Sequence, residues 1–168
     1  MRLAFALPAV TSPSVVKSCL LNDNDPIFAA IAAHQRAYDA YCNWIDKSES
    51  IEAVLPAEKR TWYSGAYERQ PPDDCKDDQA WVLLQIAGNE FFDKVCRAHV
   101  VVVSTEPTTF AGVLALLSYI GTREKGGNEF LGDIFTGEYL AGKPVYRDTG
   151  LLFVETITKA VKKLSKVH

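Results

Sequence analysis

Residues 25–47 read DPIFAAIAAHQRAYDAYCNWIDK, and this stretch decides the fold class. Asp25 is suited to accept a hydrogen bond from an early backbone N–H, and Pro26 suits the first helical position, where no donor is needed. Residues at the three- and four-residue spacing of one helical face follow: Ile27, Ile31, His34, Tyr38, Tyr41, Cys42 and Ile45. The stretch therefore predicts a helix over residues 26–47.

Two further helices are predicted on either side of a turn. The segment 78–104 carries large apolar residues at helical spacing and begins after acidic residues, which suit the positive end of a helix. Its four valines at 100–103 also favour a strand, but the helical period continues into them without a turn signal. A turn at 104–108 follows, and Thr108 is a suitable N-cap for a helix over 109–122.

The remainder of the chain divides into an arm, an excursion and a last helix. Residues 1–24 show no sustained period and are predicted to form an extended arm. Residues 123–148 hold many of the glycines with aromatic residues between them, which favours an excursion or a small hairpin. Residues 149–166 carry apolar side chains on one face and lysines on the other, which predicts a fourth helix.

These elements predict an all-α fold, a small bundle of about four helices formed by residues 25–168 as a single domain. The second and third helices, 78–104 and 109–122, are expected to pack as an antiparallel hairpin because the turn between them is short. The first and last helices are then expected to pack onto that hairpin.

The composition excludes several classes of protein. The chain has 168 residues, 48% of them apolar, and a formal charge of −3 from 18 basic and 21 acidic side chains. This balance supports one globular domain and disfavours disorder and indiscriminate nucleic-acid binding. No apolar run approaches the ~18–20 residues that cross a bilayer as a helix, so no membrane partner is expected. Widely spaced cysteines favour reduced thiols in the cytoplasm, and they are Cys19, Cys42, Cys75 and Cys96.

The familiar catalytic and cofactor motifs do not occur in the sequence. There is no GxxxxGKS/T or GxGxxG phosphate loop, no GxSxG elbow and no HExxH or ExxH metal motif. Cys96 and His99, one helical turn apart, form a weak candidate pair for a metal, because a zinc site needs further ligands. A buried cysteine beside a hydrogen-bonded histidine is the favoured interpretation. We therefore expect no metal and no organic cofactor.

Three ring-bearing side chains define a candidate ligand pocket between the helices. His34 lies on the apolar face of the first helix, Tyr38 follows one turn later, and His99 belongs to the second helix. A histidine and a tyrosine in a cleft can do acid–base work. They can equally form a hydrogen-bonded polar contact that sets the helix register, which the sequence favours because no partner carboxylate follows from spacing.

Two strings resemble a group of small, uncharacterised bacterial proteins that are expected to be helical. One is DPIFAAI at residues 25–31, followed by His34. The other is PTT at 107–109, followed by AGV at 111–113 and ALL at 115–117. The resemblance implies a cytoplasmic bacterial helical protein. It implies no activity and no catalytic residue.

Two functions remain open from the sequence. The favoured hypothesis is a non-enzymatic interaction protein that self-associates as a homodimer, because the arm and the excursion hold more apolar residues than a small bundle covers. The third helix would let a neighbouring helix approach closely over its small residues, Ala111, Gly112, Ala115 and Ser118. The alternative is a small-ligand-binding protein or an enzyme, whose pocket would lie near His34, Tyr38 and His99.

Overall fold

The computed structural model of the protein describes residues 24–65, 69–125, 131–140 and 142–166. These residues form four helices and one β-hairpin, with a short 3₁₀ turn after the first helix. In chain order the elements are α1 (Pro26–Glu52), the 3₁₀ turn (Ala57–Lys59), α2 (Gln79–Ser104), α3 (Phe110–Lys125), β1 (Asp133–Leu140), β2 (Lys143–Asp148) and α4 (Thr149–Leu164). The predicted arm lies outside the described residues, except for Asn24. The helical fold class is confirmed.

Three of the helices begin in the same way, at an aspartate. The side chains of Asp25, Asp78 and Asp148 each accept a hydrogen bond from a backbone N–H two or three residues further on. Each bond satisfies one of the backbone donors that a helix leaves unpaired at its start. The cap predicted at Asp25 is confirmed, as are the starts of α1, α2 and α4 to within one residue.

The helix ends follow the sequence less closely than the starts. The first helix continues from the predicted end at residue 47 to Glu52, since no proline interrupts it before Pro56. The third helix passes through Gly121 and ends at Lys125 rather than at residue 122. The valine run at 100–103 is helical, as predicted.

The predicted N-cap of α3 is wrong by one residue. The Oγ1 of Thr109, not that of Thr108, accepts a hydrogen bond from the Gly112 N–H at 2.9 Å. The Asp25 carboxylate also accepts the N–H groups of Thr108 and Thr109, both at 2.9 Å, and the Thr109 hydroxyl at 2.8 Å. One buried side chain therefore joins the starts of α1 and α3.

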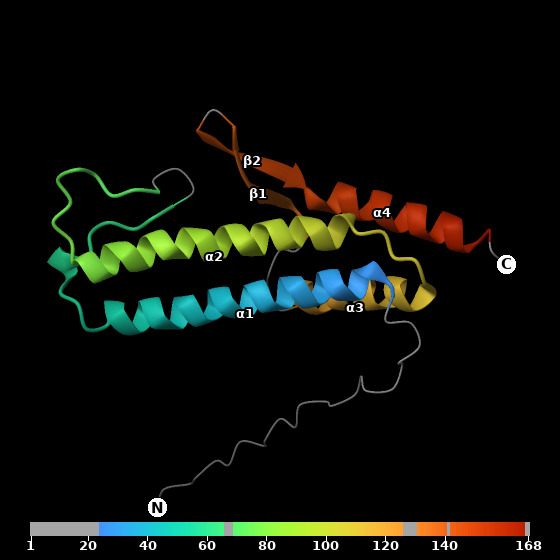
Figure 1. The fold of residues 1–168 in the computed structure, drawn as a ribbon, viewed down its shortest axis with the longest axis horizontal. Helices are drawn as coiled ribbons and strands as arrows, with labels where there is room; N and C mark the ends of the chain where they lie inside the picture. The colour runs from blue at the N-terminus through green and yellow to red at the C-terminus, as the bar shows by residue number, and fades with distance from the viewer. Residues whose placement is uncertain (1–23, 66–68, 126–130, 141, 167–168) are drawn as a thin grey trace, which may run out of the picture.

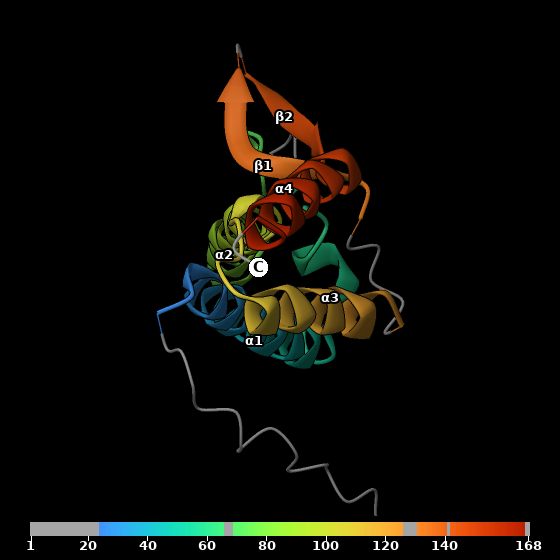
Figure 2. The ribbon, with the colours of Figure 1, turned by 90° about the vertical axis from the view of Figure 1, so that its right-hand side faces the viewer.

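The packing of the helices differs from the predicted hairpin of the second and third. Figure 1 shows α1 and α2 running antiparallel, side by side, with α4 on the other side of α2. The turn after α2 reverses the chain, but α3 then packs along α1 and crosses it obliquely (Figure 2). The physical reason is the Asp25 contact, which holds the start of α3 against the start of α1.

All four helices share a core at the end of the molecule where α1 begins and α2 ends. Side chains from α1, α2 and α3 form its buried part: Ile27, Ala30, Val102, Val103, Leu116 and Ile120. Partly buried residues, among them Leu152, Phe153 and Ile157 of α4, pack against it. This is the bundle expected from the periodicity, with a different pairing of helices.

The predicted excursion is a two-stranded antiparallel hairpin. Asp133 pairs with Asp148 and Leu140 with Lys143, with an irregularity between Phe135 and Tyr139. The hairpin rests on α2 (Figure 2). Phe135 of β1 is buried. None of the helices described is long and apolar enough to cross a membrane.

Candidate functional site

The structure brings together the three residues that the sequence placed in a pocket. His34 is 2% exposed, and its ring lies edge-on to that of His99, with 5.5 Å between the ring centroids. The ring of Tyr38 stacks beside it at 6.4 Å. The His34 Nδ1 forms a hydrogen bond of 2.7 Å with the hydroxyl of Tyr119, a residue that sequence reasoning missed.

Arg123 completes this cluster, and it was also missed. Its guanidinium lies 4.2 Å from the centre of the Tyr38 ring and donates to the Tyr119 hydroxyl from Nη2 at 3.1 Å. The same nitrogen donates to Gln35 Oε1 at 2.6 Å. Tyr119 and Arg123 are one helical turn apart on α3, a spacing that could have been noticed had the helix been extended beyond residue 122.

Burial keeps His34 of this cluster neutral. Burial, with smaller effects of His99 and Arg123, lowers the pKa of His34 from 6.5 to about 4. Burial raises the pKa of Tyr119, so its hydroxyl keeps its proton. Because Arg123 can only donate, the Tyr119 proton is directed to His34 Nδ1, which accepts it in the neutral ring. The arrangement suits a polar contact that joins α1 to α3 better than an acid–base group working near neutral pH.

The second predicted pair, Cys96 and His99, is buried on α2. Burial, with a smaller effect of Asp93, raises the pKa of Cys96 to about 12, so the thiol holds its proton. A cysteine must lose that proton to bind a metal. In the described part of the chain, no three histidine, cysteine, aspartate or glutamate side chains gather into a metal-binding group. The expectation that the protein contains no metal stays a prediction, which elemental analysis can test.

The outer face of α3 is the third feature of functional interest. Residues 110–122 contain no charged side chain. One side of this segment is in the core, while Phe110, Leu114 and Leu117 on the other side are 50%, 65% and 44% exposed. A helix that is apolar on all sides is normally buried on all sides. The outer face therefore exposes large apolar side chains that nothing in the described part of the chain fully covers.

The small residues predicted to admit a neighbouring helix do not form one surface. Gly112 is buried, and a Cβ at this position would overlap the Asp25 carboxylate, so its small size serves the contact within the chain. Ala115 is half-buried, whereas Ala111 and Ser118 are exposed beside the large apolar residues. A Cβ at Gly121 would meet nothing within 4 Å.

Comparisons with known proteins identify no relative. No protein-family model matches the chain, and no match is found among curated proteins or solved structures. The resemblance to uncharacterised bacterial proteins therefore stays a prediction, and function has to be argued from the geometry.

Proposed function

We propose that this protein is a non-enzymatic interaction protein that acts as a homodimer, and that the outer face of α3 forms the dimer contact. The observation that carries the proposal is a helical segment, residues 110–122, with no charge and with large apolar side chains on both faces. Two copies that bury this face would remove an exposed apolar patch that a monomer leaves in water.

The spacing of the exposed residues supports a second copy as the occupant. Phe110, Leu114, Leu117 and Gly121 follow one another at intervals of four, three and four residues, which is the spacing of a coiled-coil seam. A two-fold axis through the middle of this row would place Phe110 opposite Gly121 of the second copy. Leu114 would then lie opposite Leu117. A large side chain thus meets the open space at the glycine, so the face is complementary to itself.

The test is a substitution that fills this space without disturbing the monomer. Gly121→Leu should fold, because nothing lies within 4 Å of the added Cβ and leucine favours the helix over glycine by ~0.5–1 kcal/mol. The dimer should be lost, because the new side chain meets Phe110 of the other copy. Leu114→Asp should also weaken the dimer, by about thirtyfold or more, since each copy loses the burial that its Leu114 side chain gains in the contact.

The measurement is light scattering across micromolar to hundred-micromolar concentrations, with Leu83→Asp as the matched control. Leu83 is 58% exposed on α2, comparable to Leu114 at 65%, and lies outside the row. We expect the intact protein and this control to dimerise. A single-chain mass of 18.6 kDa for the intact protein throughout, or a dimer that survives Gly121→Leu, would contradict the proposal.

Two further parts of the proposal concern the arm and the compartment. The Asp25 carboxylate binds Thr108 and Thr109, which directly precede α3, so the start of α1 lies next to the start of the proposed contact. We expect deletion of residues 1–20 to weaken the dimer.

The described cysteines, Cys42, Cys75 and Cys96, form no disulfide with one another, which favours the cytoplasm.

A further inference from the structure

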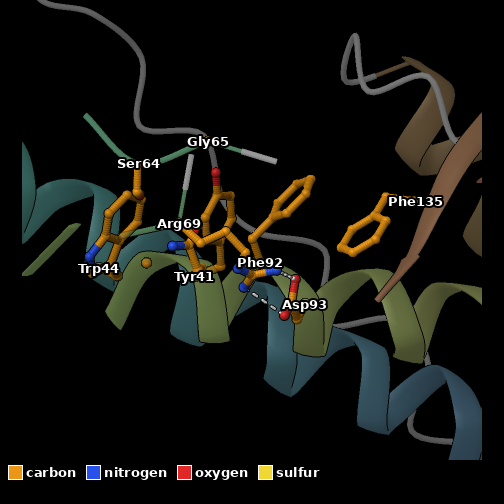
Figure 3. A pocket seen from close by; sticks show the side chains of 10 residues that line it. Tyr41, Trp44, Ser64, Gly65, Arg69, Phe92, Asp93 and Phe135 are labelled. Atoms are coloured by element: carbon orange, nitrogen blue, oxygen red, sulfur yellow. Dashed lines mark hydrogen bonds and ion pairs between the residues drawn. The ribbon is translucent and has the colours of Figure 1, made fainter. Parts of the chain in front are cut away.

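A cavity of about 190 Å³ lies between α1, α2 and β1, apart from the proposed dimer contact and from the His34 cluster. Four aromatic side chains line it: Tyr41, Trp44, Phe92 and Phe135. Figure 3 shows their rings in a row over α2, with the ion pair of Arg69 and Asp93 beside them. His34, Tyr38 and His99, which the sequence placed in a pocket, do not line this cavity.

One end of the cavity is held rigidly against α2. The Trp44 indole donates from Nε1 to the carbonyl of Leu84 at 2.9 Å. Its ring packs so closely on Gly88 that an added Cβ there would overlap it. Tyr41 stacks on Trp44 with 5.5 Å between ring centroids and 16° between ring planes. These two rings therefore present a fixed aromatic wall.

The other end is formed by two rings from different elements. Phe92 of α2 and Phe135 of β1 are stacked, with centroids 6.3 Å apart and planes at 11°. Phe135 is 4% exposed, whereas Phe92 is 41% exposed. Phe135 of the hairpin is therefore covered, while Phe92 stays partly exposed and lines the cavity.

The polar groups of the cavity carry no net charge. Arg69 donates from both terminal nitrogens to the two carboxylate oxygens of Asp93, at 3.2 and 2.8 Å. The positive charge of Arg69 and the negative charge of Asp93 neutralise each other at close range, so the cavity strongly favours neither a cationic nor an anionic ligand. Asn89 also lines the cavity, and an asparagine side-chain amide can both donate and accept hydrogen bonds.

We propose that this cavity binds a neutral, planar nitrogen heterocycle of one or two rings, of the nucleobase type. The volume sets the size, because a cavity of ~150 Å³ holds benzene and this one is somewhat larger. The aromatic walls would stack on the faces of the ligand. The Asn89 amide would pair with adjacent donor and acceptor atoms on its edge, as asparagine does with adenine.

The test is calorimetric titration of the full chain with two probes, adenine and indole. Both are planar bicycles, but indole lacks a paired donor and acceptor edge. We expect adenine to bind with a submillimolar Kd and Asn89→Leu to weaken this binding by about tenfold. The same substitution should leave any binding of indole within about twofold. This contrast separates edge recognition from simple filling of an apolar space.

A matched pair of phenylalanines tests the location. Phe92→Ala should weaken adenine binding, whereas Phe28→Ala should not, since Phe28 is 40% exposed on α1 and does not line the cavity. Thermal melting shows whether each variant is folded. If Phe92→Ala does not fold, Asn89→Leu still decides the test. The proposal is overturned if adenine fails to bind at millimolar concentration, if benzoate binds more tightly than adenine, or if Asn89→Leu has no effect.

Discussion

The charge state of His34 provides a quantitative test of the buried cluster. His34 faces His99 of α2, Tyr119 and Arg123 of α3, and Tyr38 of its own helix. Burial, followed by the effects of His99 and Arg123, lowers its pKa from 6.5 to about 4. Above pH 6.5 the ring is neutral in both the folded protein and the unfolded chain. As the pH falls from 6.5 towards 4, only the unfolded chain takes up the proton, so the free energy of unfolding decreases.

The size of the loss follows from the interval between the two pKa values. From 6.5 to about 4, at about 1.36 kcal/mol per pH unit, the folded protein loses about 3 kcal/mol. Domains are stable by only ~5–15 kcal/mol, so this loss is large enough to measure. Below pH 4 both states carry the proton, and His34 contributes no further loss.

The assay is urea denaturation followed by tryptophan fluorescence at pH 7.5, 6.5, 5.5 and 4.5, on the intact protein and on His34→Gln. Glutamine can still bond the Tyr119 hydroxyl but does not titrate, so we expect a cost of about 1 kcal/mol at pH 7.5. At pH 4.5 the variant should equal or exceed the intact protein in stability. All other titrating groups are common to both proteins, so equal losses of stability across this range would refute the neutral, buried state of His34.

Two more predictions concern contacts between helices. Asp25→Ala removes the carboxylate that caps α1 and binds the start of α3, and should lower the free energy of unfolding by about 2–4 kcal/mol in urea denaturation. An effect no larger than that of an exposed aspartate, such as Asp46→Ala, would count against the joint cap. Gly88→Ala forces a methyl group into the Trp44 ring and should cost about 1–3 kcal/mol with a shift in tryptophan emission. Gly65→Ala, where the added Cβ meets nothing within 4 Å, is the control and should change neither.

The buried cluster was only half visible in the sequence. Helical spacing placed His34 and Tyr38 on one face, since both belong to the same two turns of α1. Tyr119 and Arg123 lie more than 80 residues further on, and no local pattern links them to His34. The alternative pocket at His34, Tyr38 and His99 was predicted without these partners. With them, His34 forms a hydrogen bond to Tyr119, and the rings of Tyr38 and His99 pack against His34, while the cavity lies elsewhere.

The sequence by itself determined where helices form and where three of them start, because capping and helical spacing act within one or two turns of the chain. Asp25 with Pro26 marked the start of α1 for this reason. Only the tertiary structure decided which helices pair, since α3 is held to α1 by a carboxylate 83 and 84 residues away in sequence. It also decided which apolar faces are covered. Phe110 and Leu116 have the same character in the sequence, but the oblique packing of α3 buries Leu116 and leaves Phe110 half exposed.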